Sequence, residues 1–101
     1  MTAAINHYRV AIVKNPTEAN WYFRLGDALE DSDDTVGATA AYENAVRLNP
    51  KYDAAYYNLG NLQMKNKNMT GAHNSYIRCL KIKSSEPDYH FAMGLFYDEQ
   101  G

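Results

Sequence analysis

Residues 22–50 have the sequence YFRLGDALEDSDDTVGATAAYENAVRLNP, and this stretch predicts two helices joined by a short turn. Apolar residues recur at helical spacing on one face of each helix, namely Tyr22, Leu25 and Leu29 in the first and Ala38, Tyr42, Ala45 and Val46 in the second. The polar run from Asp31 to Asp34 between them favours a turn. Asn49-Pro50 is expected to end the second helix, because proline disfavours helix in the residue before it.

The same residue types return every 34 residues along the chain, a period known for repeats of helical hairpins. One set is Leu25-Gly26, Leu59-Gly60 and Met93-Gly94. The other sets are Ala4, Ala38 and Ala72; Tyr8, Tyr42 and Tyr76; Ala11, Ala45 and Cys79; Tyr22, Tyr56 and His90; and Pro16, Pro50 and Ser84. The sequence therefore predicts an all-α fold, an α-solenoid of antiparallel helix hairpins with about six helices.

The repeated glycines have a predicted steric role. Glycine weakens a helix, so its return at one helical position indicates that a neighbouring backbone comes too close to Gly26, Gly60 and Gly94 for a side chain. The rings of Tyr22 and Tyr42 are expected to fill the space beside the small residues. These columns therefore describe packing and carry no chemistry.

These columns resemble the tetratricopeptide repeat family. The family pattern of a large ring, Leu-Gly, an apolar residue, then Ala, aromatic, Ala and Pro is matched by Tyr22, Leu25, Gly26, Leu29, Ala38, Tyr42, Ala45 and Pro50. The next repeat matches at Tyr56, Leu59, Gly60, Ala72 and Tyr76. It departs from the pattern at Gln63, Cys79 and Ser84, and we expect these changes to loosen the core slightly without threatening the fold.

The register of the columns predicts how the chain is divided. Residues 1–16 match only the second helix of a repeat, 17–52 and 53–86 are whole repeats, and 87–101 match only a first helix, in one continuous array. The last helix is apolar almost all round, which is typical of a buried helix, so we expect a missing neighbour. Two explanations stay open. We favour a segment of a longer array; the other is self-association through Phe91, Leu95 and Phe96.

Composition and charge exclude several classes of partner. The 101 residues carry a formal net charge of -2 with acids and bases interspersed, which predicts no nucleic-acid partner. The single cysteine, Cys79, excludes an internal disulfide and favours an intracellular, cytoplasmic protein. No signal peptide is recognisable, and no apolar run approaches the roughly 20 residues that span a bilayer, so we expect no membrane insertion.

The sequence offers no convincing metal site or catalytic site. Its soft metal ligands are His7, His73, His90 and Cys79, whose spacing fits no compact zinc site, and the columns place His90 and Cys79 in the core. The acidic run from Asp31 to Asp34 resembles the start of a calcium loop, but the required glycine and the closing acid each come one residue late, so a solvated turn is expected. We found no nucleophile with a base and no phosphate-binding loop. We therefore predict no enzymatic activity, no metal and no cofactor.

The resemblance implies a binding surface. In the family, the first helices of the hairpins line a concave face that binds peptides and protein segments. Carried over to this chain, that groove contains Phe23, Arg24, Asp27, Tyr57, Asn58, Asn61, Lys65 and Phe91, with Asn20, Asp31, Leu95 and Asp98 beside them. Asn58 and Asn61 are expected to hydrogen-bond an extended backbone, and the three aromatic residues, one repeat apart, to contact apolar side chains.

Two family subtypes can be compared with this groove. Domains that bind the acidic C-terminus of chaperones present lysine, asparagine and arginine where this chain has Phe23, Asp27, Asp88 and Ala92, and only Asn58 fits. The asparagine ladder of protein O-glycosyltransferases is also represented only by Asn58. We predict a protein-interaction scaffold that binds a protein or peptide partner. A substrate-recruiting region of an enzyme such as a protein O-glycosyltransferase and a self-assembling structural array stay open as alternatives.

Overall fold

The computed structural model describes residues 2–101 and contains six α-helices in that range. They are α1 (Thr2–Lys14), α2 (Ala19–Asp31), α3 (Thr35–Leu48), α4 (Asp53–Lys65), α5 (Met69–Ile82) and α6 (Pro87–Gln100). Residues 2–101 contain no strand, which confirms the prediction of an all-helical chain with about six helices. Within this range, every helix is too short or too polar to cross a membrane.

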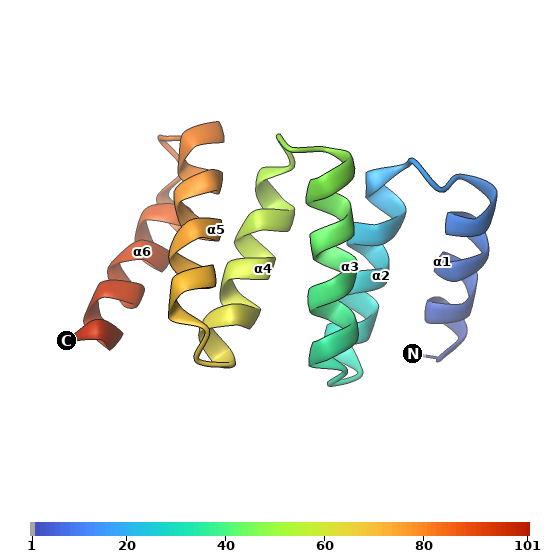
Figure 1. Ribbon diagram of the computed structural model, residues 1–101, viewed down its shortest axis with the longest axis horizontal. Coiled ribbons are helices and arrows are strands. Elements are labelled where there is room, and N and C mark those ends of the chain that lie inside the picture. Colours follow the sequence, from blue (N-terminus) through green and yellow to red (C-terminus); the bar gives the residue numbers. More distant parts are fainter. Residues whose placement is uncertain (1) are drawn as a thin grey trace. The chain divides into compact units, whose positions relative to one another are not determined.

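The chain divides into two compact units, with the boundary after Pro50. In the first unit, α2 packs mainly against α3 and also contacts α1. In the second unit, α4 packs mainly against α5, and α6 contacts both of them. Consecutive helices within each unit run antiparallel, as their short connections require (Figure 1). The division into two repeats and two half repeats stays a prediction.

The turn inside each hairpin ends the first helix with one residue in the left-handed conformation. Asp33 and Lys67, which are 34 residues apart, have φ angles of 62° and 66°. After Asp33 the chain folds back, so that the Asp34 N–H donates to the Leu29 carbonyl over 2.9 Å, and the corresponding bond in the second hairpin is 2.8 Å. These bonds satisfy carbonyl groups that the end of a helix leaves unpaired.

The next residue in each turn starts the second helix. The carboxylate of Asp34 accepts a hydrogen bond from the Gly37 N–H at 2.9 Å, and the Asn68 side chain accepts one from the Gly71 N–H at 3.1 Å. Both residues therefore cap the N-terminus of the helix that follows. The polar turns predicted from the sequence are confirmed.

Each unit is built around one buried tyrosine, Tyr42 in α3 and Tyr76 in α5, which are 0% and 2% exposed. A Cβ on Gly26 would lie 2.6 Å from the Tyr42 ring, and one on Gly60 would lie 2.7 Å from the Tyr76 ring. Glycine is therefore required at both positions. The predicted close approach is confirmed at Gly26 and Gly60, although a tyrosine ring and not a backbone fills the space. It is wrong at Gly94, where a Cβ would meet nothing within 4 Å, because no described helix of the second unit packs on that face of α6.

The last helix, α6, buries one face and exposes the other. Its buried residues are Tyr89, Ala92, Met93 and Phe96, while Phe91, Leu95 and Tyr97 are exposed. His90 was predicted in the core, but it is exposed and its Nε2 lies 2.6 Å from the Ser84 carbonyl oxygen. That prediction was wrong because nothing in the described second unit packs on this face of α6 as α5 packs on α4. Cys79 is buried as predicted.

Candidate functional site

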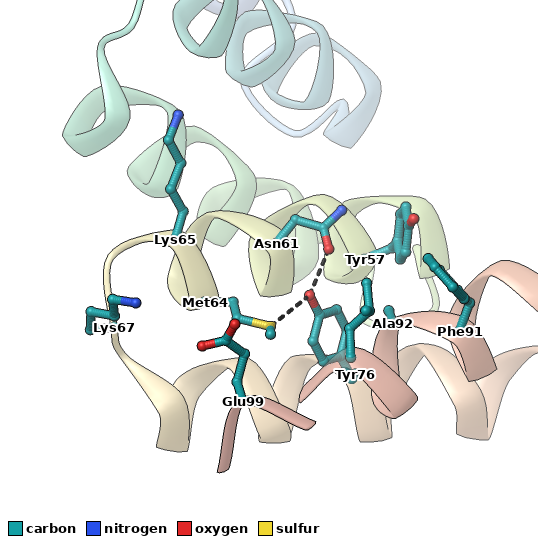
Figure 2. A pocket seen from close by; sticks show the side chains of 10 residues that line it. Tyr57, Asn61, Met64, Lys65, Lys67, Tyr76, Phe91, Ala92 and Glu99 are labelled. Atoms are coloured by element: carbon teal, nitrogen blue, oxygen red, sulfur yellow. Dashed lines mark hydrogen bonds between the residues drawn. The ribbon is translucent and has the colours of Figure 1, made fainter. Parts of the chain in front are cut away.

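Side chains of α4, α5 and α6 line a pocket of about 380 Å³ in the second unit (Figure 2). The lining residues are Tyr57, Asn61, Met64, Lys65 and Lys67 from α4 and the turn after it, Tyr76 from α5, and Phe91, Ala92, Leu95 and Glu99 from α6. Phe91 is 68% exposed and Leu95 is 45% exposed. The pocket therefore presents an uncovered apolar wall to solvent, which is typical of a binding surface.

A hydrogen bond from a buried tyrosine fixes the polar side of the pocket. The Tyr76 hydroxyl donates to Asn61 Oδ1 at 2.6 Å and lies 3.7 Å from the Met64 sulfur (Figure 2). Burial, with smaller contributions from Tyr57 and Cys79, raises the pKa of Tyr76 to about 12, so the hydroxyl stays a donor at neutral pH. Because its oxygen accepts this bond, the Asn61 amide can offer its two N–H groups to a ligand.

The aromatic wall of the pocket is fixed by a contact between α4 and α6. The ring of Tyr57 packs on that of Tyr89 with a centroid distance of 5.1 Å, and the Tyr89 hydroxyl donates to Asp53 Oδ2 at 2.6 Å. Burial and this hydrogen bond raise the pKa of Tyr89. Asp53 also forms a salt bridge with Lys83 at 3.5 Å. These contacts hold the N-terminal end of α6, where Phe91 lies, against the start of α4.

The charged residues of the lining are Lys65, Lys67 and Glu99, and all three are exposed. Two cations and one anion give the pocket a small positive excess. Such exposed charges change affinity only modestly, but they select against ligands of the same sign. The residues of this lining include no nucleophile beside a base.

The structure brings together four of the eight predicted groove residues. These four are Tyr57, Asn61, Lys65 and Phe91. Leu95, from the wider predicted face, also lines the pocket, whereas Asp98 does not. Asn58 lies half-buried on α4 and is not part of this lining.

The other three predicted groove residues, Phe23, Arg24 and Asp27, belong to α2 in the first unit. Arg24 and Asp27 line a separate pocket of about 250 Å³ with Ala4, Tyr8, Ala28 and Asp31. Phe23 packs on Tyr42 with a ring-centroid distance of 5.8 Å. Asp27 Oδ1 accepts a hydrogen bond from the Tyr42 hydroxyl at 2.5 Å, so it supports the core as well as the surface.

Sequence reasoning missed five residues of the lining. They are Met64, Lys67, Tyr76, Ala92 and Glu99. The repeat period could have found Glu99, because it lies 34 residues after Lys65 in the predicted groove. It could not have found Lys67, since that residue lies in a turn whose left-handed backbone directs its side chain.

Two sequence families match the part of the chain that contains both buried tyrosines. A family described as TPR repeat matches residues 35–67, and one described as tetratricopeptide repeat matches residues 53–86. The chain belongs to the tetratricopeptide repeat family. The two matches to tetratricopeptide repeats together span just over half of its residues. A sequence search of curated proteins found no significant match.

Several solved structures share this tetratricopeptide repeat fold. Two crystal structures of MamA are both 29% identical to the chain, with TM-scores of 0.91 and 0.93, and cover 96% and 99% of it. The chain spans only 57% and 55% of those MamA chains. The first TPR of Spaghetti (RPAP3), bound to an HSP90 peptide, has a TM-score of 0.90 at 18% identity, covering 95% of this chain and 76% of its own. The Arabidopsis OM64 TPR domain has a TM-score of 0.89 at 19% identity, covering 95% and 79%.

Proposed function

We propose that this chain is a protein-interaction module and that the pocket between α4 and α6 binds an extended segment of a partner protein. The observation that supports this most strongly is the lining itself, in which the exposed side chains of Phe91 and Leu95 lie in one pocket with the Asn61 amide. An apolar anchor in such a pocket supplies most of the binding free energy. An amide with free donors fixes the direction of an extended backbone.

The expected affinity follows from the area that the partner would cover. Fully burying one large apolar side chain contributes about 1.5–3 kcal/mol, and Phe91 and Leu95 both have uncovered surface to bury. Ordering the bound segment opposes this gain. We therefore expect a weak interaction, with a dissociation constant on the order of a millimolar for a single short segment.

The charges of the pocket indicate which segments bind best. Lys65 and Lys67 outnumber Glu99, so a segment with an apolar side chain next to an acidic one is favoured over a basic segment. This preference does not require the set of lysine, asparagine and arginine residues that binds the acidic C-terminus of chaperones, of which the sequence analysis found only Asn58.

A structural neighbour gives a precedent for the mode of binding. The RPAP3 TPR domain holds the HSP90 peptide SRMEEVD, and its fold is shared by this chain. At 18% identity the likeness concerns the fold alone. It supports peptides as the class of ligand and does not extend to that peptide.

Peptides selected from a random display library against this chain would test the proposal, with affinities measured by isothermal titration calorimetry. Phe91→Ser removes the most exposed ring of the pocket and should weaken binding by about tenfold or more. Val36→Ser is the matched control, because Val36 is 83% exposed on α3, outside the pocket. Equal affinities for the two variants, or a failure to select any peptide, would overturn the proposal.

A further inference from the structure

Within the described residues of the second unit, the face of α6 on the side of Gly94 has no cover of the kind that α5 provides for α4. Tyr56 and Gly60 of α4 are buried, whereas the residues one repeat later in α6, His90 and Gly94, are exposed. A Cβ on Gly60 would meet the ring of Tyr76, but a Cβ on Gly94 would meet nothing within 4 Å. The position that a tyrosine occupies in the α4–α5 hairpin is therefore empty beside α6.

The first helix has the complementary feature, a tyrosine of the same column that is not fully covered. Tyr8 lies one repeat before Tyr42 and packs on Trp21 with a ring-centroid distance of 6.5 Å. It is half-buried, while Tyr42 is fully buried against α2. The α1 residues on the same face are also more exposed than their counterparts in α3. These pairs are Ala4 and Ala38, His7 and Ala41, and Ala11 and Ala45.

The two terminal helices carry opposite charges. In α1 the charged residues are Arg9 and Lys14, with no acid. In α6 they are Asp88, Asp98 and Glu99, with no lysine or arginine. Complementary charge of this kind favours association between helices and sets their partner.

We propose that copies of this chain associate head to tail, so that α6 of one copy and α1 of the next form a hairpin like α2–α3 and α4–α5. In this hairpin the Tyr8 ring covers Gly94, just as the Tyr42 ring covers Gly26 and the Tyr76 ring covers Gly60. The Tyr8 hydroxyl reaches the carboxylate of Asp98. Asp98 stands one repeat after Met64, which contacts the Tyr76 hydroxyl, and two repeats after Glu30, which contacts the Tyr42 hydroxyl.

This interface differs from the peptide pocket and from the self-association surface predicted from the sequence. Phe91 and Leu95 line the pocket, and Phe96 is 5% exposed and packs on His73, so its ring is not available to another chain. The new interface uses the neighbouring face of α6 and meets the pocket at Leu95, which stands one repeat after Asn61. Because its two sides are different surfaces, the contact can repeat and produce assemblies of more than two copies, as open chains or closed rings.

Sedimentation velocity of this 101-residue chain over a range of concentrations tests the proposal. The wild-type average mass should rise beyond that of two chains. Gly94→Leu fills the space for Tyr8 and should lower the association constant by about tenfold or more, while circular dichroism shows an unchanged fold. His7→Glu places a negative charge against the acidic α6 and should also weaken association.

A matched control and a mixing experiment make the test specific. Asn6→Glu adds the same charge one residue away, at a position that is exposed in α1, α3 and α5, and should leave association unchanged. Gly94→Leu blocks only the α6 end and His7→Glu only the α1 end. A mixture of these two variants should therefore form a one-to-one dimer that grows no further. A wild-type chain that stays monomeric, or a mixture that forms no dimer, would overturn the proposal.

A symmetric pairing of α6 with α6 makes a different prediction. Gly94→Leu would then abolish association and His7→Glu would leave it intact. That outcome would also overturn the head-to-tail arrangement.

Discussion

The α2–α3 hairpin and the α4–α5 hairpin share the same turn conformation and the same glycine–tyrosine contact but surround their buried tyrosines with different polar groups. The Tyr42 hydroxyl donates to Asp27 at 2.5 Å and lies 3.0 Å from Glu30 Oε1, so two carboxylates share one hydroxyl. Burial first, and then Asp27 and Glu30, raise the pKa of Tyr42. One repeat later, the Tyr76 hydroxyl has Asn61 and a methionine sulfur in place of the two acids.

A second pair of positions also differs between the two hairpins, and the two polar replacements there are partners of each other. Gln63 and Ser75 of the second hairpin stand where the first hairpin has Leu29 and Ala41. The Ser75 hydroxyl donates to Gln63 Oε1 at 2.6 Å, so the polar replacement at one position has its partner at the other. Both departures from an apolar core are accommodated together.

The comparison separates what the fold requires from what it leaves free. Glycine against a tyrosine ring and a left-handed turn residue are present in both hairpins, because the backbone geometry depends on them. The acceptor of the tyrosine hydroxyl can change from a carboxylate to an amide. In the second hairpin that amide belongs to Asn61, which also lines the pocket. A position whose residue type the fold does not fix is therefore part of the proposed binding site.

The largest expected effect tests the steric part of the comparison. Gly60→Leu should destabilise the chain by about 2–3 kcal/mol, because the Tyr76 ring leaves no room for a side chain. At a concentration at which the chain is monomeric, Gly94→Leu should be neutral or stabilising by up to about 1 kcal/mol, because its side chain enters open space and helix propensity improves. Urea unfolding monitored by circular dichroism measures both. Similar losses for the two variants would contradict the assigned role of the tyrosine ring.

The next effect tests the polar difference between the hairpins. Tyr42→Phe should cost about 1.5–3 kcal/mol, the range for a hydrogen bond to a charged group. Tyr76→Phe should cost only about 0.5–1.5 kcal/mol, because its acceptor is a neutral amide. The same unfolding measurement ranks them, and the reverse order would show that the carboxylates do not strengthen the first hairpin.

A smaller effect is expected from the polar pair of the second hairpin. Ser75→Ala should cost about 1 kcal/mol, because it removes the donor to Gln63. Adding Gln63→Leu copies the pair found in the first hairpin and should recover most of that loss. A double-mutant cycle measures the coupling, and purely additive effects would mean that the two residues act independently.

The smallest effect concerns Cys79, which stands where the first hairpin has Ala45. Burial raises the pKa of the thiol from 9.0 to about 11, so the folded chain keeps a proton that the unfolded chain loses between these values. This stability is fully present below pH 9 and is lost as the pH rises towards 11. Cys79→Ala should therefore reduce the loss of stability between neutral pH and pH 10. Identical losses in wild type and variant would contradict the shifted pKa.

Much of the fold could be predicted from the sequence, because the repeat period constrains many positions at once. Six helices and the two polar turns follow from the spacing of Leu25, Tyr42 and their counterparts. The period predicts a close approach at Gly26, Gly60 and Gly94, but it cannot name the atoms, and at Gly94 nothing lies within 4 Å of a Cβ. His90 shows a second limit of prediction from the repeat. A residue at a core position of the repeat is buried only where a neighbouring helix covers it, and His90 is exposed.

Less of the candidate site could be predicted. Tyr57, Asn61, Lys65 and Phe91 were found because the family resemblance identifies the exposed face of each first helix. Lys67 and Tyr76 were missed for a physical reason. A turn residue or the far side of a core tyrosine reaches the pocket through local backbone conformation and side-chain packing, which no residue pattern records.

The most direct test of the account is an amide NMR titration of this chain with a library-selected peptide. The proposal predicts chemical-shift changes concentrated on α4 and α6, with Asn61, Lys65, Phe91 and Leu95 among the largest, and their loss in Phe91→Ser. Shifts concentrated instead around Met69, His73 and Tyr97, which line another pocket of the second unit, would contradict it.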